Sequence, residues 1–158
     1  MQHEESYKLT RGLLELLLIN KFPVSISTKS LLIKRDIDLL KEIASTAILP
    51  EDLNGKLNSG VILSVSISSL DEKVACMLEP GAATPGERLA LIKYLREEGF
   101  TAGVNAMPLL PFISDTDEKI EEIIIAAKEN NADYILTDGL TLFDNGPADS
   151  KTLYYRFI

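Results

Sequence analysis

Side chains capable of catalysis or metal binding are sparse in this sequence. Cys76 is its only cysteine and His3 its only histidine. One thiol cannot form an internal disulfide, and alone it cannot hold a structural zinc or an iron–sulfur cluster, because such sites need several thiolate or imidazole ligands. His3 is expected in a frayed terminus without a positioned partner, so the sequence predicts no acid–base pair and no Ser-His-Asp assembly.

Candidate ligand-binding residues follow the predicted strands. Lys29 comes directly after an apolar strand, where its ammonium can project toward the ligand end of a sheet; a solvated lysine is the alternative. Ser66 and Ser68 stand two residues apart, which puts both hydroxyls on one face, where they can meet ribose oxygens or cap the next helix. Asn105 and Met107 share a face of the third strand, with core packing as the alternative to ligand contact.

Two charged pairs favour structural roles. Glu79 could present a carboxylate to a substrate, but Arg88 lies about one turn inside the next predicted helix, and we expect the two to pair. Asp36 is interpreted as the N-cap of a helix, with Arg35 as its neighbour. No catalytic role is predicted for these four residues.

Hydrophobic periodicity and turn residues predict alternating strands and helices. The expected strands span about residues 22–28, 61–68, 101–107 and 133–137. Helices are expected over about residues 4–20, 36–44, 71–78, 85–98 and 147–158. One more helix, between the third and fourth strands, is expected to begin with a capping box of Asp115 and Glu118. Such order implies an α/β fold of parallel strands, either an open doubly wound sheet or part of a barrel, with ligands at the carboxyl ends of the strands.

Composition indicates one folded domain over residues 1–158. The chain is 46% apolar and 25% charged, which is typical of a globular protein. Its formal charge of −8 opposes broad contact with a phosphate backbone, so any contact with nucleic acid would be local. No apolar stretch approaches the ~20 residues of a membrane helix. The N-terminus is acidic, whereas a secretion signal begins with basic residues, so we expect a cytoplasmic protein.

Several strand-end segments, taken in order, resemble a known family. They are Thr28-Lys29-Ser30, residues 34–40 (KRDIDLL), residues 64–68 (SVSIS), Leu78-Glu79-Pro80-Gly81 followed by Pro85 and Arg88, and Met107-Pro108-Leu109-Leu110-Pro111. Together they resemble the DNA-repair-photolyase-like branch of the radical S-adenosylmethionine (SAM) superfamily, related to spore photoproduct lyase. The resemblance covers about residues 7–142.

The resemblance implies a fold and a cofactor. Members of the family fold as a partial barrel of six β/α units, bind a [4Fe–4S] cluster through a C-x-x-x-C-x-x-C loop and cleave SAM reductively. We therefore expect about four strands of a radical SAM barrel, a partial TIM-barrel-like arrangement of parallel β/α repeats, with the first two strands and the cluster loop outside this sequence. The resemblance also assigns Lys29 to the methionyl carboxylate of SAM, Ser66 and Ser68 to its nucleoside, and the strand of Asn105 and Met107 to the neighbourhood of the adenine.

Two functions of different class follow. The first is the SAM-binding C-terminal part of a radical SAM enzyme, inactive alone, whose cluster ligands come from another chain, from upstream residues or not at all. The second is a non-catalytic α/β binding or interaction module. Nucleic acid and DNA repair enter only through the family resemblance.

The first prediction concerns the cluster. After anaerobic reconstitution with iron and sulfide, the chain should hold no stoichiometric [4Fe–4S] cluster and should not cleave SAM, because Cys76 is a single thiol within a predicted helix. Iron and sulfide analysis of about four atoms each per monomeric chain, with the matching absorption spectrum, would contradict this expectation.

The second prediction concerns self-association. A four-stranded parallel fragment leaves two unpaired edges and an uncovered apolar face, which proteins normally pair or cover. We expect a homodimer, with Tyr154, Tyr155 and Phe157 as candidate contacts. Sedimentation velocity at micromolar concentrations should detect the dimer, and a monomer at every concentration would count against it.

Overall fold

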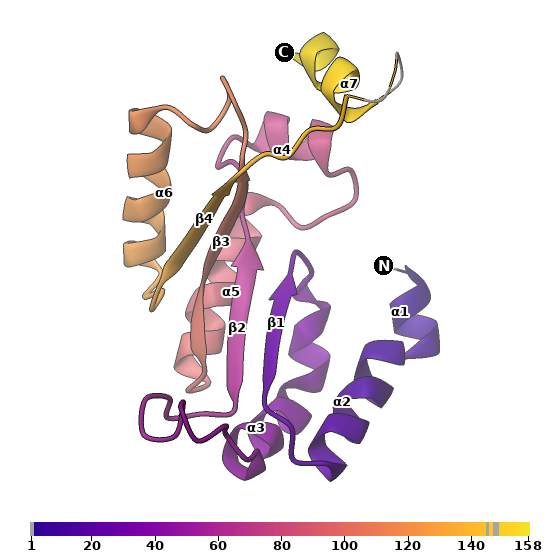
Figure 1. Cartoon of the computed structure of the whole chain (residues 1–158), viewed down its shortest axis with the longest axis vertical. Helices are drawn as coiled ribbons and strands as arrows, with labels where there is room; N and C mark the ends of the chain where they lie inside the picture. Colours follow the sequence, from indigo (N-terminus) through magenta and orange to yellow (C-terminus); the bar gives the residue numbers. More distant parts are fainter. Residues whose placement is uncertain (1, 145, 147–148) are drawn as a thin grey trace.

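A computed structural model describes residues 2–144, 146 and 149–158 of the chain as an α/β fold around a four-stranded parallel sheet (Figure 1). The strands lie side by side in sequence order: β1 (Val24–Thr28), β2 (Val61–Ser66), β3 (Thr101–Leu109) and β4 (Ile135–Gly139). The helical segments are α1 (Gln2–Tyr7), α2 (Leu9–Ile19), the 3₁₀ helix η1 (Leu31–Asp36), α3 (Ile37–Thr46), α4 (Glu72–Leu78), α5 (Pro85–Glu97), α6 (Asp117–Glu129) and α7 (Ser150–Phe157). The predicted strand–helix alternation is confirmed, and the sheet is open.

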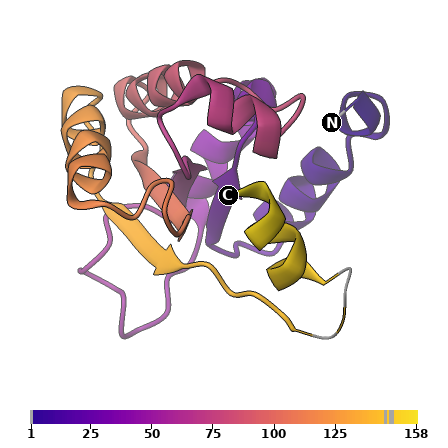
Figure 2. The same cartoon turned by 90° about the horizontal axis from the view of Figure 1, so that it is seen from above.

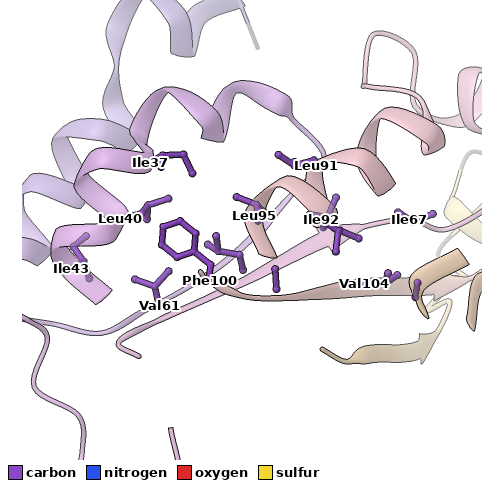
Figure 3. Packing of buried hydrophobic residues seen from close by; sticks show 14 of the residues in the cluster. Ile37, Leu40, Ile43, Val61, Ile67, Leu91, Ile92, Leu95, Phe100 and Val104 are labelled. Atoms are coloured by element: carbon purple, nitrogen blue, oxygen red, sulfur yellow. The ribbon is translucent and has the colours of Figure 1, made fainter. Parts of the chain in front are cut away.

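Helices α3, α5 and α6 lie over one face of the sheet, whereas α7 lies on the other side (Figure 2). Along the strands, α7 lies near their carboxyl ends (Figure 1). Alternation along β2 sends Val61, Leu63 and Val65 toward the helices, where all three are buried. Figure 3 shows the resulting core, with side chains of α3 and α5 packed on those of the strands. Its members include Leu40, Ile43, Leu91, Ile92, Leu95, Phe100 and Val104.

Helix α5 begins with a capping box. The Thr84 hydroxyl accepts from the Glu87 backbone amide at 3.2 Å, and the Glu87 carboxylate accepts from the Thr84 amide at 2.8 Å, with Pro85 at the first helical position. Gly99, with φ of +89°, follows the helix as expected for a residue that must adopt a left-handed conformation.

The predicted capping box at α6 is wrong. Thr116, not Asp115, is the N-cap, and its hydroxyl accepts from the Lys119 amide. The Asp115 carboxylate accepts from the Phe112 amide at 2.7 Å, so it closes the preceding turn instead. The predicted start of the last helix at Pro147 lies outside the described residues; α7 begins at Ser150.

The N-terminal region also differs from its predicted form. The single helix expected over residues 4–20 is two helices, because Lys8 adopts a left-handed conformation with φ of 50° between them. His3 lies within α1, so the expected frayed terminus is wrong at this position. None of the helices in the described ranges is both long and apolar enough to cross a membrane.

Asp36 does not cap α3 with its side chain, contrary to the sequence interpretation. Its buried carboxylate accepts from Arg11 Nη1 at 3.0 Å and from Arg35 Nη2 at 2.8 Å, and Arg35 also pairs with Glu4 at 3.0 Å. Burial alone would raise the pKa of Asp36, but the hydrogen bonds from Arg35 and Arg11 outweigh it and hold that pKa below its usual value. This ionic network attaches α1 and α2 to η1.

The face of the sheet away from the helices is more polar than predicted. It carries serine side chains from β1 and β2 and Asn105 from β3, while α2 is among the elements that carry exposed large apolar side chains. Those on α2 are Leu9, Leu13, Leu16 and Ile19. Among the described residues β1 and β4 pair on one side only, so both edges expected from the sequence are present.

Replacing Asp36 by Asn should lower the free energy of unfolding by about 2 kcal/mol near neutral pH, because two guanidinium groups lose their shared carboxylate. A group whose pKa is depressed in the folded state stabilises it above the unfolded pKa and loses that effect as the pH falls through the folded pKa. The difference between wild type and Asp36→Asn should therefore shrink below about pH 4 in urea titrations. Asp52→Asn, at an exposed turn, is the matched control; an Asp36→Asn difference that is the same at pH 7 and pH 3 would contradict the assignment.

Candidate functional site

An open cavity of about 490 Å³ lies at the carboxyl ends of the strands, where ligands gather in parallel α/β folds. We call it the strand-end cavity. Lys29, directly after β1, and Ser68, two residues after β2, line it together with Glu79. The rest of its lining is largely apolar: Leu78, Pro108, Leu110, Leu140, Leu142, Ser150, Leu153, Tyr154 and Phe157.

Glu79 joins two cations at the edge of this cavity. Its Oε1 lies 2.5 Å from Lys29 Nζ and its Oε2 lies 2.5 Å from Arg88 Nη2. We call this arrangement the Glu79 bridge. The expected pairing of Glu79 with Arg88 is confirmed. The second ion pair of the same carboxylate, with Lys29, was not predicted from the sequence.

Arg88 holds its end of the bridge rigidly. Only 2% of its side chain is exposed, and it also donates from Nε to the Ala83 carbonyl at 2.7 Å and from Nη1 to the Ser66 carbonyl at 3.0 Å. Because each of the three nitrogens of this buried guanidinium has a partner, the group has little freedom to move. The bridge therefore connects the end of β2, through Arg88 and Glu79, to the end of β1.

The bridge leaves a local excess of positive charge. Burial alone would raise the pKa of Glu79, but hydrogen bonds from Lys29 and Arg88 outweigh it, so that pKa lies below its usual value and the carboxylate is ionised at neutral pH. Two cations and one anion sum to +1 at this point of a chain whose formal charge is −8. The arrangement favours an anionic ligand group.

Ser66 and Asn105 belong to a different part of the site. Ser66 Oγ lies 3.1 Å from Ser27 Oγ, and Asn105 Nδ2 donates to Ser27 Oγ at 3.0 Å, so the three side chains cross strands β1 to β3 on the face away from the helices. Asn105 Oδ1 is buried and has no hydrogen-bond partner in the described part of the chain. Neither Ser66 nor Asn105 lines the strand-end cavity.

Ser68 and Met107 lie at neighbouring strand ends. The Ser68 hydroxyl donates to the Met107 carbonyl at 3.4 Å, a long contact that leaves the hydroxyl available to a competing partner. Met107 itself is half-buried and is not among the cavity residues. The structure thus brings Lys29 and Ser68 to one cavity, whereas Ser66, Asn105 and Met107 are not part of its lining.

Ser27 and Tyr134 are polar residues of this face that the sequence analysis missed. The alternation of residues 24–28 was the available signal for Ser27, since it faces the same side as Ser66. Tyr134 OH contacts Ser64 Oγ and the Leu63 carbonyl, each at 2.9 Å. Gly103 permits this approach, because a Cβ at that position would lie 2.4 Å from the Tyr134 carbonyl oxygen.

Helix α7 completes the outer wall of the strand-end cavity. Its Leu153, Tyr154 and Phe157 line the cavity, and Tyr154 OH donates to the Pro111 carbonyl at 2.8 Å. Two of the three aromatic residues expected at an interface, Tyr154 and Phe157, thus contribute to the cavity, while Tyr155 is exposed.

The described residues do not fit a metal or an iron–sulfur cluster. Across residues 2–144, 146 and 149–158, no three or more His, Cys, Asp or Glu side chains are grouped so that they could hold a metal ion. Cys76 is exposed on α4 and carries no second thiol nearby, since the sequence has one cysteine.

Comparison with known proteins identifies relatives that are longer than this chain; no family model matches it. The uncharacterized protein ORF301 of Acidianus two-tailed virus is 32% identical over 123 residues, which cover 78% of this chain and 36% of that protein. The uncharacterized protein Rv2578c of Mycobacterium tuberculosis is 31% identical over 121 residues, which cover 77% of this chain and 32% of that protein. The chain therefore spans about a third of the length of the curated relatives it matches.

The fold resembles part of SuiB from Streptococcus suis. SuiB bound to S-adenosylmethionine superposes with a TM-score of 0.56 at 20% identity, over 82% of this chain and 26% of SuiB. SuiB in a second crystal structure gives a TM-score of 0.58 over 85% of this chain and 27% of SuiB. The likeness confirms the expected fold class: parallel β/α repeats that form an open, four-stranded part of a radical SAM-like barrel.

Proposed function

We propose that this chain is the SAM-binding part of a radical SAM protein of the DNA-repair-photolyase-like branch, related to spore photoproduct lyase. The observation that carries the proposal is the contact between Lys29 Nζ and a carboxylate at the edge of an open cavity at the strand ends. The carboxylate there is that of Glu79, and a ligand carboxylate has the same charge and hydrogen-bonding geometry. The SuiB structure with bound SAM supports the choice of ligand.

The described residues offer groups that fit the parts of SAM. Lys29 would bind the methionyl carboxylate, and Ser68 would donate to or accept from the nucleoside within the same cavity. The apolar walls contributed by Pro108, Leu110 and α7 would exclude water from the adenosyl group.

The cluster itself would need ligands from outside this chain. A [4Fe–4S] cluster is held by several thiolates, and the sequence has Cys76 alone. In this proposal the chain binds and orients SAM, and the cysteine loop belongs to another segment or another chain. The substrate, including the damaged nucleic acid that the photolyase-like branch implies, would likewise be met by the assembled protein.

The proposal predicts that SAM affinity depends on Lys29 more than on either serine. A charge-assisted hydrogen bond contributes roughly 1.5–3 kcal/mol against about 1 kcal/mol for a neutral one. Lys29→Ala should therefore weaken SAM binding by roughly ten- to a hundredfold, and Ser66→Ala by less than about tenfold, in isothermal titration calorimetry.

The control ligand is 5′-methylthioadenosine, which lacks the carboxylate, and the control variant is Lys93→Ala, which removes the same charge from an exposed position on α5. Lys93→Ala should bind SAM as the wild type does. Equal wild-type affinity for both ligands, or normal SAM binding by Lys29→Ala, would refute the role of Lys29. An absence of SAM binding by the wild type would refute the proposed function and favour the interaction module.

A further inference from the structure

Lys29 is already occupied in this structure. Its ammonium contacts Glu79 Oε1 at 2.5 Å, and the side chain remains 39% exposed, so it is held by a carboxylate while still facing open space. Any incoming anion must either displace Glu79 from Lys29 or share the ammonium with it. Two carboxylates on one ammonium repel each other, which makes displacement the favoured outcome.

The two contacts of Glu79 differ in how easily they can open. On the Arg88 side, the guanidinium is buried and held by the Ala83 and Ser66 carbonyls as well as by Glu79. On the Lys29 side, the partner is a long and partly exposed side chain that makes no other hydrogen bond or ion pair within the described part of the chain. Opening the Lys29–Glu79 contact leaves Glu79 paired with Arg88, whereas opening the Arg88–Glu79 contact would leave a buried cation with one partner fewer.

Lys29 has open space around it. It lines the strand-end cavity and also a second open cavity of about 690 Å³, whose other lining residues are 30–32, 80–83 and Glu5. Lys29 belongs to the lining of both cavities, and Glu79 to that of the strand-end cavity. The ammonium can therefore leave Glu79 without entering a packed region.

We propose that Glu79 is an internal competitor for Lys29: its carboxylate occupies the ammonium until a ligand carboxylate replaces it, while Arg88 retains Glu79. The inference rests on the proposed function, because it names what regulates the same SAM site. It assigns Glu79 a role that neither a purely structural ion pair nor a substrate-binding carboxylate would have. The role is to lower affinity for carboxylate ligands and to leave affinity for their neutral analogues unchanged.

Two variants separate competition from structural support. Glu79→Gln removes the charge but keeps an oxygen that can accept from Arg88, so the buried guanidinium retains an acceptor. Glu79→Asp keeps the charge but shortens the side chain by one methylene, which withdraws it from Lys29. Both should bind SAM about three- to tenfold more tightly than the wild type, because a partly exposed ion pair no longer opposes binding.

The controls follow from the same logic. Affinity for 5′-methylthioadenosine, which has no carboxylate, should be unchanged in both variants. Glu97→Gln makes the same change in net charge at an exposed position in the last turn of α5 and should leave SAM affinity at the wild-type value. The double variant Lys29→Met with Glu79→Gln should bind SAM no more tightly than Lys29→Met alone, because the ammonium for which Glu79 competes is absent from both.

Isothermal titration calorimetry of the intact chain, with circular dichroism to confirm folding, separates the outcomes. Tighter SAM binding by either folded variant with unchanged control affinity supports the inference. Measurable wild-type SAM binding that Glu79→Gln and Glu79→Asp leave unchanged or weaken overturns the inference and leaves the proposed function standing. Failure of wild type and variants alike to bind SAM overturns both.

Discussion

A single carboxylate bridging two cations organises the ligand end of this fold. Glu79 follows α4, Lys29 follows β1 and Arg88 lies in the first turns of α5, so three separate segments meet at one ionised group. Burial disfavours an ionised carboxylate, and the two cations offset that cost. The position of the strand ends relative to α5, and with it the shape of the strand-end cavity, depends on this bridge.

Alternation along the strands separates packing from ligand chemistry. Residues of β2 that face α3 and α5 are Val61, Leu63 and Val65, while Ser64 and Ser66 face the other way. The helix-facing side can therefore be fully apolar without limiting what the opposite side carries. Hydroxyl and amide groups from three strands gather on that opposite side because the parallel register brings Ser66 opposite Asn105.

Much of the fold could be predicted from the sequence, because local signals set it. Thr84, Pro85 and Glu87 define the start of α5 through bonds within four residues, and each of the four strands was expected close to its actual position. Asp36 and Asp115 were misassigned as caps because a carboxylate can meet several partners, and the arginine that binds Asp36 from 25 residues away left no local signal. The contacts of the site show the same difference between local and distant partners. Glu79 and Arg88 are nine residues apart in the sequence and their contact was expected, whereas Lys29 and Glu79 are 50 residues apart and their contact was missed.

The strand order has a consequence for how the chain acquires its structure. Each strand pairs with the strand made immediately before it, so no strand has to wait for a later one to be inserted between its neighbours. During synthesis on a ribosome, β2 can join β1 as soon as β2 itself has emerged, and β3 can then extend the same sheet, so that structure grows in the direction of translation. The sheet also needs no threading when a β/α unit is gained or lost at either edge, which makes this arrangement tolerant of growth and shortening by whole units during evolution.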